Sequence, residues 1–372
     1  MMTYKNLAIL QKYVHWNEAS APLLYNSVAD AAPCYEDLSA GGFLVDPLGK
    51  RTDVQLPSHF NQDETVFVHQ GDTHRQSLRA GGNIPLQNFK RHIIIPHTTG
   101  LCPYDVRASN EMAALTGTEH AGDVICTDII KPIFTELFLN TKFDDSEVFY
   151  ERPYDRYRSL KSYQEELKKW LDEGTVVTRP IEINQYYLEK VKTSIERDMS
   201  AVCVALNWCS IRNRGHTMYV VSRLNELVKS MGCKLILRTH SFDHGTNGYL
   251  KQIEGVQFEH EYWGRQLNKF ESMDAYGTYV VDPTGYGLEL AYRARGTGTR
   301  IFYMETKCKN QEFGGIETMG LLPEKTLLQF MNNPECESYY PEWIIDGIFH
   351  HENVDSIPDL VTNTILEVAN NV

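Results

Sequence analysis

A glycine-rich turn late in the chain has residue types that suit phosphate binding. Its sequence is Asp282-Pro283-Thr284-Gly285-Tyr286-Gly287-Leu288-Glu289, between an apolar run and a helical pattern. Glycines after a strand let the backbone approach a ligand, and the first amides of the next helix favour phosphate oxygens. Glu289, about one turn into that helix, can accept hydrogen bonds from ribose hydroxyls. The alternative is a plain strand-to-helix turn with a solvated Glu289, and the spacing matches neither the dinucleotide fingerprint nor a Walker A loop.

Two loops earlier in the same half add polar groups. The loop 207–216 contains Arg212 and Arg214, which can neutralise a diphosphate beside a helix N-terminus, although a solvated basic loop is equally compatible with the pattern. The loop 238–244 contains His240, from which we expect polar contacts to a ligand. His240 and His244 have a metal-compatible separation, but their segment is turn-like, so the imidazoles need not converge and we expect no metal site.

In the first half, "VFVHQGDTH" and "IIIPHTTG" each end an apolar run with histidine and a glycine turn. Asp72 and His97 therefore fall near strand ends, where a carboxylate or an imidazole can act as general base. His69, His74 and Asp128 are weaker candidates of the same kind. The alternative is a set of turn-forming aspartates and partly buried histidines.

Strand and helix patterns alternate regularly from Ala201 onward, which predicts a parallel α/β sheet. We expect strands at 201–208, 234–240, 256–262, 277–283 and 300–305, and helices at 216–232, 264–273 and 285–294.

The first 150 residues contain four apolar runs separated by glycine, proline and polar stretches, which predict a second α/β domain. These runs are "NLAIL", "ETVFVH", "RHIIIPH" and "DVICTDII". Helical spacing also predicts a helix over 159–174 and a terminal helix over 356–370, with Ser356 as its N-cap.

Composition and charge narrow the function classes. The chain has 372 residues, 42% hydrophobic and 23% charged, with a net charge of −13. Residues 200–330 carry 15 basic against 13 acidic side chains, so an anionic ligand meets the least repulsion there. No basic stripe is visible, which disfavours nucleic acid as a partner. The eight cysteines are scattered, and neither a signal peptide nor a membrane span is apparent, so we expect a cytoplasmic protein with reduced thiols.

Taken together, these residues resemble the GT-B superfamily of nucleotide-sugar enzymes, which includes glycosyltransferases and UDP-GlcNAc 2-epimerases. The turn 282–289 is similar to that superfamily's glycine-rich turn and following glutamate, and "FVHQGDTH" is similar to a strand end of the epimerases. The pattern departs from retaining transferases, because Val281 stands where a second glutamate is common. No D-x-D triplet of metal-dependent transferases occurs.

The resemblance implies two Rossmann-like α/β domains that face each other across a cleft. Residues 1–199 would form the acceptor-side domain, residues 200–355 the nucleotide-sugar domain, and residues 356–372 a helix returning to the first. Glu289 would hold the ribose, Thr284, Gly285, Tyr286 and Gly287 would lie at the phosphates, and Arg212 or Arg214 would bind the diphosphate.

The implied activity is a metal-independent glycosyl transfer from a UDP-linked donor, used as co-substrate with no bound cofactor, to an acceptor hydroxyl. Asp72 or His97 would be its base. An epimerase or hydrolase of the same fold, and a non-catalytic nucleotide-sugar or glycan-binding protein, remain alternatives. The acceptor is open among a glycan, a lipid-linked sugar, a protein and a hydroxylated nucleic-acid base.

Overall fold

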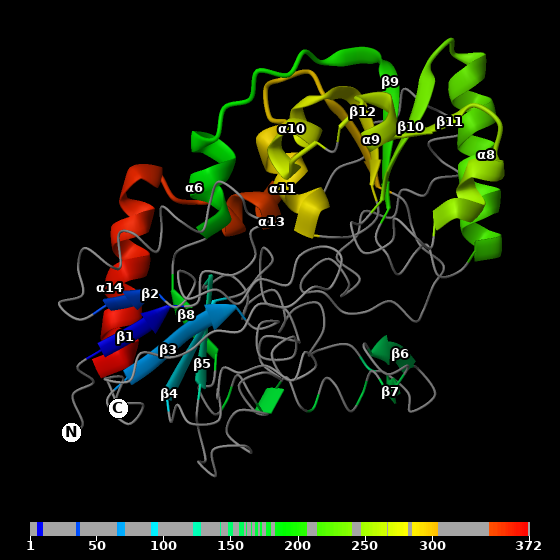
Figure 1. Cartoon of the computed structure of the whole chain (residues 1–372). Coiled ribbons are helices and arrows are strands. Elements are labelled where there is room, and N and C mark those ends of the chain that lie inside the picture. Colours follow the sequence, from blue (N-terminus) through cyan, green and yellow to red (C-terminus); the bar gives the residue numbers. More distant parts are fainter. Residues whose placement is uncertain are drawn as a thin grey trace. The chain divides into compact units, whose positions relative to one another are not determined.

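The computed structural model of the chain shows an α/β fold with two parallel sheets (Figure 1). It describes residues 6–9, 35–37, 65–70, 91–95, 122–127, 142, 148–151, 156–159, 161, 165, 168–169, 172, 176–179, 183–206, 214–239, 247–265, 267–281, 285–303 and 342–370. The chain divides into two compact units. One comprises residues 1–132, 165–187 and 348–372, and the other residues 133–164 and 188–347. The expected α/β class with two Rossmann-like sheets is confirmed.

The first unit contains a six-stranded sheet of order β2-β1-β3-β4-β5-β8, in which all neighbours are parallel. Its strands are β1 (Asn6–Ile9), β2 (Tyr35–Asp37), β3 (Thr65–Gln70), β4 (Arg91–Ile95), β5 (Gly122–Thr127) and β8 (Val176–Arg179). The four apolar runs predicted as strands are β1, β3, β4 and β5. Ile93 of β4 is fully buried, and the terminal helix α14 (Ile357–Asn370) contacts that strand.

The second unit contains a five-stranded parallel sheet of order β11-β10-β9-β12-β13, with β9 at its centre. Its strands are β9 (Asp198–Leu206), β10 (Lys234–Thr239), β11 (Val256–Phe258), β12 (Tyr276–Val281) and β13 (Arg300–Tyr303). Its main helices are α8 (Arg214–Ser230), α9 (Glu259–Tyr262), α10 (Lys269–Asp274) and α11 (Gly285–Arg293). The alternation of strand and helix predicted from Ala201 onward is thus confirmed.

The remaining described elements lie outside these two sheets in the chain. They are the antiparallel hairpin β6 (Val148–Glu151) and β7 (Arg156–Ser159), α6 (Ile183–Lys190), α13 (Glu342–Ile348) and the short 3-10 helices η5 (Asn247–Gln252) and η7 (Val354–Ser356). Of the helix predicted over 159–174, five exposed helical residues are described, namely Lys161, Glu165, Lys168, Lys169 and Asp172. Its predicted apolar face lies outside the described residues.

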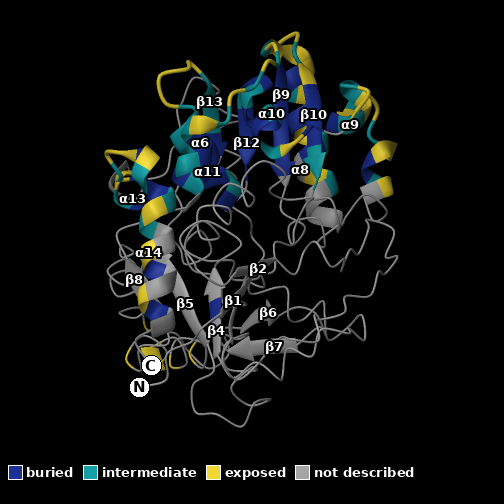
Figure 2. Cartoon of the chain, turned by 60° about the vertical axis from the view of Figure 1, so that its left-hand side comes forward, coloured by how far each residue is buried: buried dark blue, intermediate teal, exposed yellow. Residues whose placement is uncertain are grey.

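Strand alternation gives the second sheet two different faces, since successive side chains point to opposite sides. Val204, Leu237 and Val280 belong to the face that packs with Val221 and Leu224 of α8 in one buried apolar cluster. The neighbouring residues on the same strands, which include Cys203, Arg238 and Tyr279, belong to the opposite face. There the Tyr279 hydroxyl donates to the carbonyl oxygen of Ser272 in α10, and Arg238 lies against Tyr286 of α11. Figure 2 shows the central strands of this sheet, β9, β10 and β12, as largely buried. The second face therefore has a polar interior at its carboxyl end.

The carboxyl end of α8 is capped by a glycine in the left-handed conformation. Gly232 ends the α8 segment with φ 72°, and the backbone amides of Gly232 and Cys233 bond the carbonyls of Lys229 and Val228 at 3.0 and 2.9 Å. Glycine adopts this left-handed conformation without steric cost, so Gly232 lets the chain leave the helix there.

Several predicted bounds in this unit are shifted, and two of them differ by four or five residues. The strand predicted over 256–262 ends at Phe258, and a single helical turn follows, because Glu259 turns its carboxylate to Arg238. The helix predicted from residue 264 begins at Lys269, because Asn268 forms a capping box with Glu271 and so sets the start of the helix.

Candidate functional site

The carboxyl ends of three strands lie side by side in the second sheet. Thr239, the last residue of β10, pairs with Leu206, the last residue of β9, and Val281, the last residue of β12, pairs with Ala205. The chain runs from β9 to β10 on one side and returns to β12 on the other side of β9. Parallel sheets bind ligands outside their carboxyl ends at such a reversal of strand order. The segments 207–213, 240–246 and 282–284 therefore all start at the edge that is suited to a ligand.

Five of the predicted site residues lie outside the described residues. Arg212, His240 and Thr284 belong to the three segments just named. Asp72 and His97 each fall two positions beyond a strand end of the first sheet, since β3 ends at Gln70 and β4 at Ile95. Their roles stay predictions.

The structure brings the other predicted residues to the starts of two helices. Arg214 is the first residue of α8, and Gly285 is the first residue of α11, with Tyr286 and Gly287 in the same first turn. Gly285 and Gly287 are buried. The predicted glycine-rich turn thus falls between the end of β12 at Val281 and the start of α11 at Gly285.

Glu289 is buried rather than solvated. Its side chain is 3% exposed and forms an ion pair with the Nζ atom of Lys269, the first residue of α10. The alternative of a plain turn with Glu289 in solvent therefore does not describe this carboxylate. Burial of a charge requires a partner, and the ion pair supplies one. Whether Glu289 also binds a ribose stays a prediction.

Tyr286 points inward to a buried polar network beside the three strand ends. Its ring lies against the guanidinium of Arg238, with 5.3 Å between Cζ and the ring centroid, and its hydroxyl is 3.2 Å from Oγ of Ser272. Arg238 donates from Nη1 to Oε2 of Glu259 at 2.5 Å, and Ser272 donates to Oε1 at 2.5 Å. The phenol of Tyr276 also donates to Oε1, at 3.3 Å. The network thereby joins β10, α9 and α10 to the first turn of α11.

The charges of this network follow from its burial and its partners. Burial alone would lower the pKa of Arg238, but Glu259 and the other neighbouring groups together more than offset it, so the pKa is raised and the guanidinium stays charged. Burial raises the pKa of the Tyr286 phenol, although Arg238 opposes the shift. Burial and the nearby Glu259 also raise the pKa of the Cys203 thiol. Arg238 is therefore a cation, whereas Tyr286 and Cys203 are neutral and unsuited to nucleophilic attack.

Sequence reasoning missed Arg238, Glu259, Ser272 and Lys269 as members of the site. One signal was available, because a charged residue that closes the apolar run of β10 must find a partner or reach solvent. No spacing rule connects Arg238 with Glu259, since β11 pairs with β10 only in the folded sheet.

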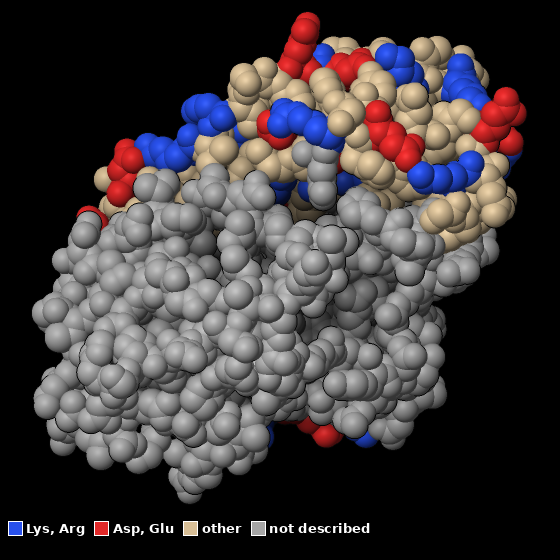
Figure 3. Space-filling view, in the orientation of Figure 1, with Lys and Arg blue, Asp and Glu red and all other residues tan. Residues whose placement is uncertain are grey.

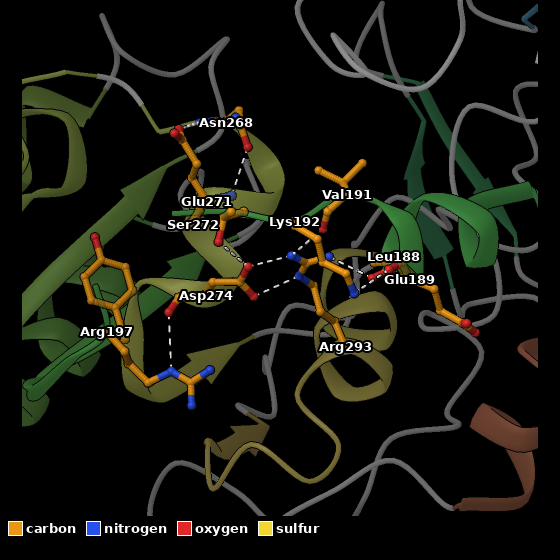
Figure 4. A network of polar contacts seen from close by, with 12 residues as sticks. Leu188, Glu189, Val191, Lys192, Arg197, Asn268, Glu271, Ser272, Asp274 and Arg293 are labelled. Atoms are coloured by element: carbon orange, nitrogen blue, oxygen red, sulfur yellow. Dashed lines mark hydrogen bonds and ion pairs between the residues drawn. The ribbon is translucent and has the colours of Figure 1, made fainter. Parts of the chain in front are cut away.

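A second polar network connects α10 and α11 (Figure 4). Arg293 donates from Nε and Nη2 to the two carboxylate oxygens of Asp274, at 2.8 and 2.5 Å. It also donates to the carbonyl oxygens of Leu188 and Val191, at 2.7 and 3.0 Å. Thr193 donates to Asp274 at 2.6 Å. The last turn of α11 is thus tied to the end of α10 and to the segment that precedes β9.

The described residues contain no group of three or more potential metal ligands, and none of the described helices is long and apolar enough to cross a membrane. On the face shown in Figure 3, the basic and acidic side chains of the described part of the chain are interspersed. The described residues on that face therefore form no continuous basic stripe of the kind that binds nucleic acid.

No protein-family model and no curated protein sequence matches this chain. Among solved structures, the wall teichoic acid polymerase TagF is similar with a TM-score of 0.47 and 12% identity, covering 99% of this chain and 88% of that chain. A putative UDP-N-acetylglucosamine 2-epimerase from Listeria monocytogenes has a TM-score of 0.44 and 10% identity, with 98% and 95% covered. MnaA of S. aureus, solved with UDP, has a TM-score of 0.46 and 9% identity, with 99% and 97% covered.

These solved structures belong to the GT-B superfamily that the sequence resembles. Because all of these TM-scores lie below 0.5, the likeness says nothing about activity or about single residues. The α/β fold rests on the two parallel sheets of the chain itself.

Proposed function

We propose that this protein is a metal-independent glycosyltransferase that takes a UDP-linked sugar as donor and an acceptor hydroxyl as nucleophile. The observation that carries the proposal is the sheet register of the second unit. It sets the ends of β10, β9 and β12 next to one another, with α11 starting at Gly285 directly beyond the central edge. Arg212, His240 and Thr284, the residues expected to contact the donor, belong to the segments that leave this edge.

The chemistry requires a site that stabilises a leaving nucleoside diphosphate. Without a metal, the developing charge must be met by guanidinium groups and by backbone amides at a helix start. We expect the first amides of α11 to supply one kind of group, and Arg212 before α8 together with Arg214 at its first position to supply the other. A base must also take the acceptor proton, and Asp72 and His97 are the residues we propose for it.

A thermal-shift screen of nucleotide sugars tests the donor. A ligand at 100 times its Kd stabilises a protein by about 2.7 kcal/mol, and we expect a UDP-sugar to give such a shift. Glu289→Gln keeps the size of the side chain and removes its charge, so we expect it to weaken the shift. Glu226→Gln is the matched control, because Glu226 is exposed on α8 and pairs only with Arg223 among the described residues. A full shift in Glu289→Gln rejects the ribose role, and no shift with any nucleotide sugar rejects the proposal.

Epimerisation or hydrolysis of the same donor is the second candidate. It is favoured by β3, which ends at Gln70 directly before Gly71-Asp72-Thr73, the segment similar to a strand end of the epimerases. Incubation of the protein with UDP-GlcNAc and no acceptor separates the two activities, since an epimerised or free sugar forms only under this second candidate. A donor that binds but is never consumed, with any acceptor, indicates a non-catalytic binding protein instead.

A further inference from the structure

Arg238 stands at the edge where the nucleotide is proposed to bind, although no sequence pattern assigns it to a ligand. It is the last residue but one of β10 and pairs in register with Ala205 of the central strand β9. Its side chain points to the face of the sheet that carries α11. Tyr286, against which the guanidinium lies, belongs to the first turn of that helix.

The guanidinium is held in one orientation from two sides. Nη1 donates to Glu259, whose carboxylate is 6% exposed and is fixed in turn by Ser272 and Tyr276. The ring of Tyr286 covers one face of the guanidinium, 5.3 Å from Cζ to the ring centroid. An arginine restrained in this way loses little side-chain entropy when it binds a ligand.

One edge of this guanidinium has no partner in the described part of the chain. Among the residues that the structure describes, Nε and Nη2 of Arg238 have no hydrogen-bond partner, and 22% of the side chain is exposed. Arg293 shows what the same edge does when it is occupied, because its Nε and Nη2 hold both oxygens of Asp274. Two parallel donors of this kind match two oxygens of a carboxylate or a phosphate.

We propose that Arg238 binds a diphosphate group through its Nε and Nη2 edge. The inference rests on the proposed function for the identity of that diphosphate, which is the one that links the nucleoside to the sugar. The pair with Glu259 cancels much of the net charge of Arg238, so geometry matters more than charge. Arg238 therefore contributes a fixed, bidentate contact, and Arg212 or Arg214 contributes the net positive charge.

The affinities of the full-length protein for UDP, uridine and inorganic pyrophosphate, measured by calorimetry or competition, test this inference. Arg238→Lys keeps the positive charge but lacks the two parallel donors. We expect it to weaken UDP and pyrophosphate binding about tenfold or more and to change uridine binding less than about twofold. Arg223→Lys is the matched control, because this arginine on α8 also has one carboxylate partner but lies 50% exposed, and we expect no change in any of the three affinities.

A second variant guards against misfolding. Removing Arg238 alone would leave the buried carboxylate of Glu259 without its cation, which is strongly destabilising. Arg238→Gln combined with Glu259→Gln removes both charges together and keeps a hydrogen-bonding side chain at each position, and we expect the same loss of diphosphate affinity.

The outcomes separate this inference from the proposed function. Unchanged UDP affinity in both variants, or equal losses for UDP and uridine, overturns the role of Arg238 while leaving the nucleotide site intact. Pyrophosphate binding that depends on Arg238, without binding of any nucleotide, supports the inference and rejects the proposed function. A wild-type protein that binds neither UDP nor pyrophosphate contradicts both.

Discussion

Replacement of Arg293 by methionine should destabilise the second unit more than any surface substitution. Its side chain is 9% exposed, and that of its partner Asp274 is 21% exposed. Arg293→Met removes both contacts to this carboxylate and leaves the carbonyl oxygens of Leu188 and Val191 without their donor. Breaking a buried pair by removing one partner costs about 3–5 kcal/mol. We expect about 3 kcal/mol, the lower limit, because Asp274 is partly exposed and keeps its hydrogen bond from Thr193.

The assay is thermal unfolding followed by near-UV and far-UV circular dichroism. A loss of about 3 kcal/mol lowers Tm by about 6–12 °C in a unit of this size. Asp274→Asn and the double variant complete a cycle, in which the double variant should cost clearly less than the sum of the two single changes. Arg295→Met is the matched control, since Arg295 is 42% exposed, pairs with Asp346 at the surface and should change Tm by no more than about 2 °C. A similarly small change in Arg293→Met, or simple additivity in the cycle, would refute the reasoning.

Three further predictions concern single positions in the same unit. Gly232→Ala should cost about 1 kcal/mol in urea unfolding through its φ of 72°, since nothing lies within 4 Å of an added Cβ; an unchanged midpoint contradicts this. Burial alone would raise the pKa of the Asp198 carboxyl group, but hydrogen bonds from Ser200 and Tyr262 lower it from 3.8 to about 2. The carboxylate therefore stabilises the fold above pH 4, and its contribution is lost as the pH falls toward 2, so Asp198→Asn should flatten acid unfolding curves over this range. Burial raises the pKa of Cys203, which should resist alkylation until the protein unfolds; rapid labelling of this thiol in the native protein would contradict its burial.

Much of the second sheet was predictable because its signals are local. Val221, Leu224 and Val228 recur at helical spacing and pack on one face of the sheet, and Gly232 ends the segment. Similarly, the glycine turn before α11 marks a change from strand to helix. Such patterns depend on residues close in sequence, so they can be recognised without knowledge of the fold.

The polar networks were not predictable for the opposite reason. Arg238 meets Glu259 only through the pairing of β10 with β11, and Glu289 meets Lys269 only through the packing of α11 beside α10. The ion pair also explains why the alternative of a solvated Glu289 is wrong. Helical periodicity cannot reveal that a lysine on another helix lies beside this carboxylate. Long-range pairing decides these contacts.

Hydrogen exchange of the backbone amides, measured by mass spectrometry with and without saturating UDP, tests the central claim most directly. It locates a ligand without changing a residue. The account predicts slower exchange in peptides that cover 207–216, 238–246 and 282–289, because all three segments leave the carboxyl edge of the second sheet. Peptides from the buried opposite face, such as those of α8 near Leu224, should be unchanged. Protection confined to other parts of the chain, or no protection by any nucleotide, would contradict the claim that this edge binds the donor.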